Sequence, residues 1–148
     1  MSADAKVAKD LVETLKDGQK GFAASAEKLA DSDRPEWAGT MRRFERQRAT
    51  FAQEIVGLGH EYGDDVDESG SALAAAHRGW LSLKDALTGD KPSGVLDAAV
   101  SGDNHTVSEY EKALKEDDLS DGFRAVVQRQ HGEIVAARDE VKGLQAAS

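Results

Sequence analysis

The chain has 148 residues, a formal net charge of −9 and no cysteine. A chain of this length is predicted to form one domain, residues 1–148, whose apolar core needs no disulfide bonds, and the absence of cysteine excludes them. The acidic balance argues against nucleic-acid binding, because phosphate recognition depends on clustered lysine and arginine. With two prolines and many helix-forming residues, the composition predicts an all-α protein.

The first ten residues, MSADAKVAKD, contain no apolar run of signal-peptide length. No later stretch approaches the ~20 apolar residues that span a bilayer. We therefore expect a cytoplasmic protein without membrane insertion.

Residues 3–30 are predicted to form the first helix. Its apolar stripe recurs every three or four residues and comprises Leu11, Leu15, Gly18, Phe22, Ala26 and Leu29. Two glycines, Gly18 and Gly21, fall inside this helix. Because glycine in a helix costs roughly 1 kcal/mol relative to alanine, the pair indicates close approach of a neighbouring helix or of a ligand. We favour packing.

Residues 34–62 are predicted to form the second helix, since Asp33 can cap it and Pro35 suits its first turn. Its stripe contains Trp37, Met41, Phe44, Arg48, Phe51, Ile55, Leu58 and Tyr62. One charged residue, Arg48, therefore interrupts an apolar seam. The neighbouring arginines alternate with an acidic residue, and a solvated helix face with one buried arginine explains this basic cluster.

A crossover helix is predicted over residues 70–88, with a serine cap at position 69 or 71 and Gly89 as its stop. Its stripe comprises Leu73, Ala76, Trp80, Leu83 and Leu87. Such a helix can return the chain to the other end of a bundle, with Trp80 as its anchor. We interpret His77 and Arg78, in the run His77-Arg78-Gly79-Trp80, as a solvated or capping pair rather than as a ligand site.

Residues 93–116 and 121–145 are predicted to form the third and fourth long helices. Their stripes are Leu96, Val100, Asp103, Val107, Tyr110 and Leu114, followed by Phe123, Val127, Gln130, Ile134, Ala137, Val141 and Leu144. Asp103 and Gln130 are the polar interruptions. The expected fold is a ferritin-like, up-down-down-up four-helix bundle with an additional crossover helix between the second and third long helices.

Each polar interruption lies near the middle of its helix, and we therefore expect one shared layer. Arg48 and Asp103 should form an ion pair, with Gln130 and Gln19 completing it, while Gly18 leaves room for the arginine. Such a pair is better supported as a device that fixes register than as a source of stability.

Bundles of the ferritin class hold two metal ions with Glu from two helices and Glu-x-x-His from the other two. This spacing fails here, because Arg48 follows Glu45 where histidine is required, and His131 precedes Glu133. Four residues remain as a weaker candidate metal site: Glu45, Asp103, Glu109 and His131. No nucleophile turn or phosphate-binding loop is present, and of the four histidines we expect at least three at the surface.

Four segments carry a family resemblance: LVETLKDGQKGF (11–22), FERQRATFAQEI (44–55), SGSALAAAHRGWLSLKDALTG (69–89) and SEYEKAL (108–114). They resemble an uncharacterised bacterial family, a domain of unknown function within the ferritin-like superfamily. The resemblance implies a ferritin-like fold and a bacterial, cytosolic, stress-associated protein without an established activity. Members of this family often carry Glu at position 19 and His at position 138. Gln19 and Arg138 therefore remove two potential metal ligands.

Two interpretations stay open. The favoured one is a non-catalytic helical bundle without a cofactor that acts through protein interaction, either as a homodimer or with another protein, in stress or envelope physiology. The alternative is a di-iron carboxylate protein that handles iron or peroxide.

Overall fold

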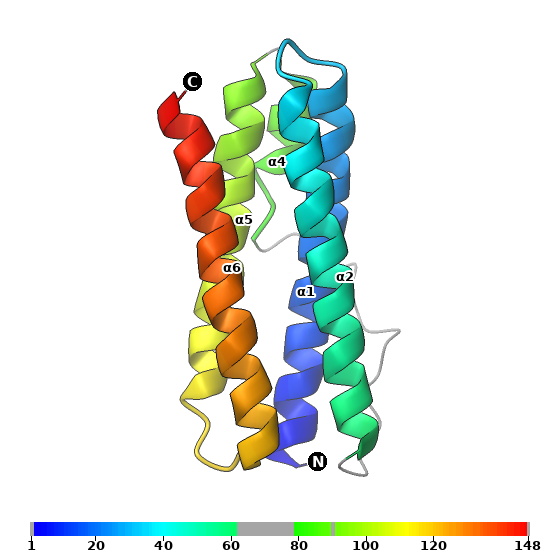
Figure 1. The fold of residues 1–148 in the computed structure, drawn as a ribbon, viewed down its shortest axis with the longest axis vertical. Helices are drawn as coiled ribbons and strands as arrows, with labels where there is room; N and C mark the ends of the chain where they lie inside the picture. The colour runs from blue at the N-terminus through cyan, green and yellow to red at the C-terminus, as the bar shows by residue number, and fades with distance from the viewer. Residues whose placement is uncertain (1, 62–78, 90, 148) are drawn as a thin grey trace.

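The computed structural model describes residues 2–61, 79–89 and 91–147. Within these ranges the regular secondary structure is helical and there is no strand, which confirms the all-α prediction for this part of the chain. The helices are α1 (Ala3–Ala30), α2 (Glu36–Glu61), α4 (Leu83–Thr88), α5 (Pro92–Leu114) and α6 (Asp121–Ala147). Figure 1 shows the four long helices side by side, with α1 and α6 running in one direction and α2 and α5 in the other. Among the described helices, none combines the length and apolarity needed to cross a membrane.

The long helices begin and end within two residues of their predicted bounds, because local chemistry defines their termini. At the start of α1, the Ala5 amide donates a hydrogen bond of 3.0 Å to the Ser2 hydroxyl. The carboxylate of Asp4 accepts hydrogen bonds from the amide and the hydroxyl of Ser120, at 2.9 and 2.7 Å. The N-terminus of α1 is thereby tied to the start of α6.

The predicted crossover helix is wrong over residues 79–82, which form a turn, and α4 has only six residues. Within this turn the indole of Trp80 points inward and is 6% exposed, whereas Leu81 is 70% exposed. The remainder of the predicted helix, residues 70–78 with His77 and Arg78, lies outside the described residues.

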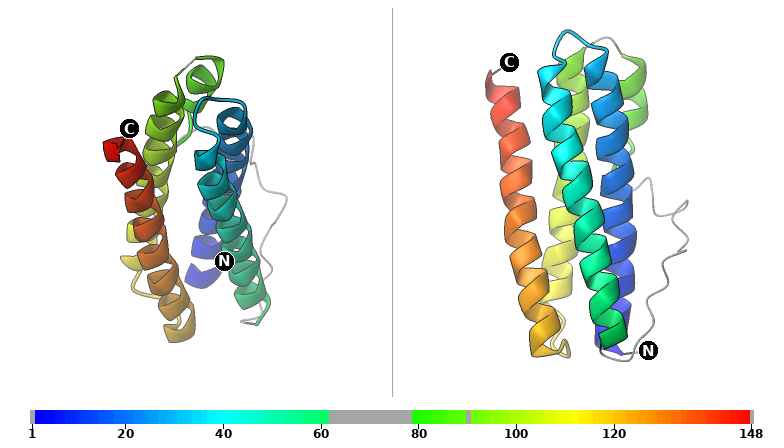
Figure 2. Two further views of the ribbon diagram at one scale, coloured as in Figure 1. Left: turned by 45° about the horizontal axis from the view of Figure 1, so that its top comes forward. Right: turned by 45° about the vertical axis from the view of Figure 1, so that its right-hand side comes forward.

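Trp80 occupies a slot between two glycines, Gly21 on α1 and Gly102 on α5. A Cβ atom at either glycine would lie within 3 Å of the indole. Phe22 contacts the ring edge-on, with centroids 5.1 Å apart. The slot anchors α4 to α1 and α5. Helix α4 itself lies near the end of the bundle where α1 leads into α2 (Figure 2). Packing therefore explains Gly21, but the partner is one side chain rather than a whole helix.

The apolar core forms two clusters along the bundle. One surrounds Leu11, Leu15, Phe51, Ile55, Tyr110, Phe123 and Ile134. The other surrounds Phe22, Trp37, Met41, Phe44, Trp80, Leu96 and Val141. Along α2, Arg48 falls between Phe44 of the second cluster and Phe51 of the first. A polar level therefore separates the two apolar ones.

Candidate functional site

The level between the two clusters is built on Arg48 of α2 and Asp103 of α5. The guanidinium donates two hydrogen bonds to the carboxylate, Nη1 to Oδ1 at 2.5 Å and Nη2 to Oδ2 at 3.1 Å. Its Nε donates to the amide oxygen of Gln47 at 3.0 Å. Both partners of the ion pair have 0% side-chain exposure. The pair is therefore a bidentate, fully buried salt bridge.

Two residues of α1, Phe22 and Gly18, face the Arg48 side chain. The Arg48 guanidinium carbon lies 5.0 Å from the ring centroid of Phe22, in a cation–π contact. A Cβ atom at Gly18 would lie 3.6 Å from Arg48 Nη1 and 3.7 Å from its Cγ, in ordinary van der Waals contact. A methyl group at position 18 would therefore fit, so the structure does not support the expectation that a glycine is needed there to leave room for the arginine.

The charges in this level balance each other. Burial raises the pKa of Asp103 above its usual value, whereas the charge and hydrogen bonds of Arg48, and more distantly the charge of Arg138, oppose that rise. Arginine stays protonated in proteins. The pair is neutral as a whole when Asp103 is ionised, and removing either partner would leave the other group buried without compensation.

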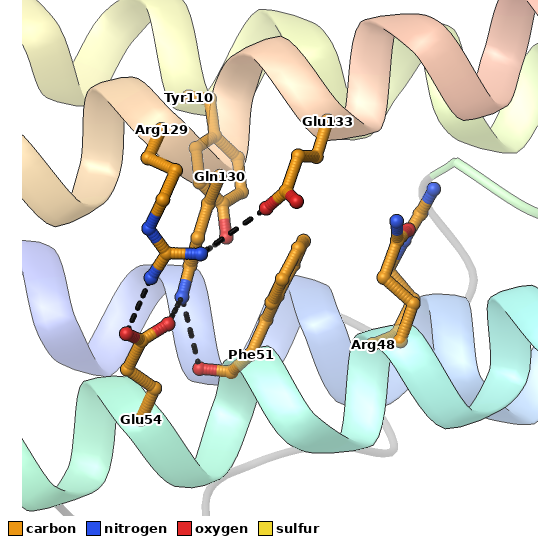
Figure 3. A network of polar contacts seen from close by, with 8 residues as sticks. Arg48, Phe51, Glu54, Tyr110, Arg129, Gln130 and Glu133 are labelled. Atoms are coloured by element: carbon orange, nitrogen blue, oxygen red, sulfur yellow. Dashed lines mark hydrogen bonds and ion pairs between the residues drawn. The ribbon is translucent and has the colours of Figure 1, made fainter.

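Gln130 does not join this pair, which corrects the expectation of a single polar layer. Its amide oxygen accepts a hydrogen bond of 2.6 Å from the Tyr110 hydroxyl. Its amide nitrogen donates to the backbone oxygen of Phe51 at 3.3 Å and to the Glu54 carboxylate at 2.8 Å. Figure 3 shows this second network apart from Arg48.

Gln130 lies away from Arg48 because α6 is shifted along its axis relative to α5. Tyr110 lies seven residues after Asp103 on α5, a rise of about 10 Å. The distance of a residue from the midpoint of its helix predicts its height in the bundle only to within about one helical turn. Gln130 lies at the height of Tyr110 rather than at that of Asp103. Burial raises the pKa of Tyr110 well above its usual value, so its hydroxyl keeps the proton that it donates to Gln130.

The second network continues to the surface through Arg129. Its guanidinium forms ion pairs with Glu54 on α2 and, at 3.1 Å, with Glu133 on α6. Sequence reasoning assigned Tyr110 to the apolar stripe and did not select Glu54 or Arg129. The available signal was the tyrosine itself, because a buried tyrosine hydroxyl usually finds a hydrogen-bond partner.

Gln19 also lies away from the ion pair. It is half-buried and, with Lys16, lines a surface hollow between α1 and α2. Gly18, its neighbour, faces Arg48 instead. Arg138, the other departure from the family pattern, donates a hydrogen bond of 3.2 Å to the side-chain oxygen of Asn104.

The structure does not bring together the four weaker metal candidates. Glu45 is half-buried on α2 and pairs with Arg42 at 3.4 Å. Asp103 is committed to Arg48 in the core. These two carboxylates therefore have separate basic partners and do not form the bridging pair that a di-metal centre requires.

The other two candidates lie on different helices, Glu109 on α5 and His131 on α6. The Glu109 carboxylate is 3.9 Å from the His105 imidazole, and both line a small hollow against α1. His131 of α6 is 3.9 Å from Glu111. Within residues 2–61, 79–89 and 91–147, no group of three or more His, Cys, Asp or Glu side chains is arranged to hold a metal ion. The described part of the chain therefore does not assemble the donor set expected for a di-iron centre.

Comparison with known proteins gives a family but no activity. A search of the curated proteins finds no match. A family model described as "Domain of unknown function (DUF2383)" matches residues 5–116, a region that contains nearly all of α1, all of α2 and α4, and α5. Because this match covers more than half of the chain, the protein belongs to the DUF2383 family of domains of unknown function.

Proposed function

We propose that the chain is a single ferritin-like helical-bundle domain that is not catalytic and acts through protein interaction, as a homodimer or with another protein. The up-down-down-up order of the long helices supports the ferritin-like assignment. The bacterial origin, cytoplasmic location and stress-associated role rest on the family resemblance alone.

The observation that carries the proposal is the buried Arg48–Asp103 pair. It occupies the middle of the bundle, where ferritin-class proteins place their metal ions. A guanidinium in that position repels a second cation, and its contacts with Phe22 and Gly18 fill the space that an ion and its ligands would need. The interior therefore serves the fold, and we place the activity of the protein on its surface.

The pair also suits a role in specifying the fold. Buried polar groups are best attested as devices that select one register among several apolar alternatives. Arg48 joins α2 to α5, and the Gln130 network joins α2 to α5 and α6 at a second level. Two polar levels at different heights favour one axial arrangement of the helices, and with it a defined surface for a partner.

An iron titration tests the proposal. Protein purified without chelators is subjected to elemental analysis and then titrated with Fe(II) in air, with absorbance and melting temperature recorded. We expect iron well below one equivalent, no ferric oxidation band and an unchanged melting temperature. Stoichiometric iron with an oxidation band would overturn the proposal and restore the di-iron alternative. The Arg48→Leu, Asp103→Leu double variant is the matched control, because it removes the cationic side chain without adding a potential metal ligand.

A further inference from the structure

A groove of about 640 Å³ lies between α1 and α4. The described residues that line it are Asp17, Lys20, Gly21, Trp80, Leu81, Leu83, Lys84, Leu87 and Thr88. Gly21 and Trp80 are buried and form its floor, whereas Leu81 and both lysines are exposed and form its rim. The volume falls within the range typical of small-molecule sites, roughly 300–1,000 Å³.

The walls of the groove are mainly apolar. Leu83 and Leu87 lie one helical turn apart on α4, so they offer about 6 Å of apolar surface along the helix axis beside the indole. Leu81 extends this surface and, at 70% exposure, is the one large hydrophobic residue that stands out to solvent in the described part of the chain. An elongated apolar group fits this row of leucines.

The charges at the rim indicate which polar group a bound molecule would carry. Lys20 on α1 and Lys84 on α4 stand on opposite sides of the groove, in a chain whose net charge is −9. The acidic residue of the lining, Asp17, is only 8% exposed and also borders the neighbouring hollow with Glu13 and His105. Among the described lining residues, the exposed charges are therefore positive.

We propose that this groove binds a free single-chain amphipathic carboxylate, such as a medium-chain fatty acid. The alkyl chain lies over Trp80 along Leu83 and Leu87, and the carboxylate lies between Lys20 and Lys84. Burial of the chain supplies most of the affinity, at roughly a fourfold change in Kd for each fully buried CH₂ group. The exposed lysines supply orientation and charge selectivity and contribute less, because solvent screens them. This inference goes beyond the proposed function and is tested independently of iron.

The probe is sodium dodecanoate, added to the full chain below its micellar concentration and followed by calorimetry and tryptophan fluorescence. The Trp37→Phe variant leaves Trp80 as the only tryptophan. We expect saturable binding of one equivalent and a change in Trp80 emission. Decanoate, which is two CH₂ groups shorter, should bind about 15-fold more weakly. Dodecyltrimethylammonium, with the same chain and the opposite charge, should bind more weakly by a similar factor.

Substitutions at the rim locate the site. Lys20→Gln with Lys84→Gln should weaken dodecanoate binding about fivefold and reduce its salt dependence. The matched pair Lys6→Gln with Lys142→Gln removes two exposed lysines outside the groove and should leave the affinity unchanged. Leu81→Glu should also weaken binding, and its exposure leaves the core intact. Circular dichroism verifies that each variant is folded.

Three results would overturn the proposal. The first is that dodecanoate shows no saturable binding up to millimolar concentration, and the second is that the anionic and cationic amphiphiles bind with equal affinity. The third is that the two lysine double variants lose the same amount of affinity for dodecanoate. A fourth arm uses phosphatidylglycerol vesicles without free fatty acid. Co-sedimentation with vesicles in the absence of dodecanoate binding would assign the surface to a membrane and would likewise reject the proposal.

Discussion

Removal of Arg48 is the most informative single perturbation of this fold. Arg48→Leu leaves the Asp103 carboxylate with 0% exposure and without the two hydrogen bonds, at 2.5 and 3.1 Å, that now satisfy it. The double variant Arg48→Leu, Asp103→Leu removes both charges together. Comparing the unfolding free energies of the two variants separates the net contribution of the ion pair from the cost of leaving one charge buried and unpaired.

The expected magnitudes differ clearly between these variants. Breaking a buried pair by removing one partner costs on the order of 3–5 kcal/mol of unfolding free energy. Replacing both partners with apolar residues is often neutral or stabilising. We therefore expect Arg48→Leu to be less stable than the double variant by at least about 2 kcal/mol. The exposed Arg46→Leu on the same helix is the matched control, and its effect should stay within about 0.5 kcal/mol.

The penalty of Arg48→Leu should also depend on pH. Burial already raises the pKa of Asp103, and Arg48 provides the main opposing charge. Without Arg48, the folded-state pKa rises further above the unfolded value, so the folded state binds a proton more strongly than the unfolded one. The variant is then most stable below the unfolded pKa and loses stability as pH rises, by up to about 1.4 kcal/mol per pH unit until the folded-state pKa is passed. The deficit relative to wild type should be smaller at pH 5 than at pH 7.

Urea denaturation followed by circular dichroism at 222 nm, at both pH values, measures these differences. A double variant that is no more stable than Arg48→Leu would refute the reasoning. Equal stability of Arg48→Leu and wild type would also refute it, because the arginine would then have no structural role.

Further substitutions probe the rest of the fold. Gly102→Ala places a methyl group within 3 Å of the Trp80 indole and should destabilise the fold by about 1–3 kcal/mol, with a red shift of the tryptophan emission as the ring leaves its slot. Gly132→Ala, on an open face of α6, should instead raise the urea midpoint, with a gain of about 0.5–1 kcal/mol. Gln130→Leu should cost about 1–3 kcal/mol, because the Tyr110 hydroxyl loses its acceptor; Tyr110→Phe in the same chain should recover part of that loss in a double-mutant cycle.

The sequence alone determined the features that depend on neighbouring residues. The four long helices follow from stripes of three and four residues, and their bounds agree with the structure to within two residues. The Arg48–Asp103 contact also follows from the stripes, because a charge within an apolar seam must face the interior and needs an opposite partner there. Gly18 could be assigned to the same level from its position along the first helix, and it faces Arg48 in the structure.

Only the tertiary structure decided how these elements fit together. Periodicity shows which face of a helix is buried but not how far one helix is shifted along its neighbour. Gln130 was therefore expected beside Arg48 and lies instead with Tyr110 and Glu54. The crossover stripe likewise predicted a helix through Trp80, whereas the turn exists because the indole enters a slot formed by glycines from two distant helices. Such a slot depends on side-chain volume across the bundle, and no local pattern along one helix records it.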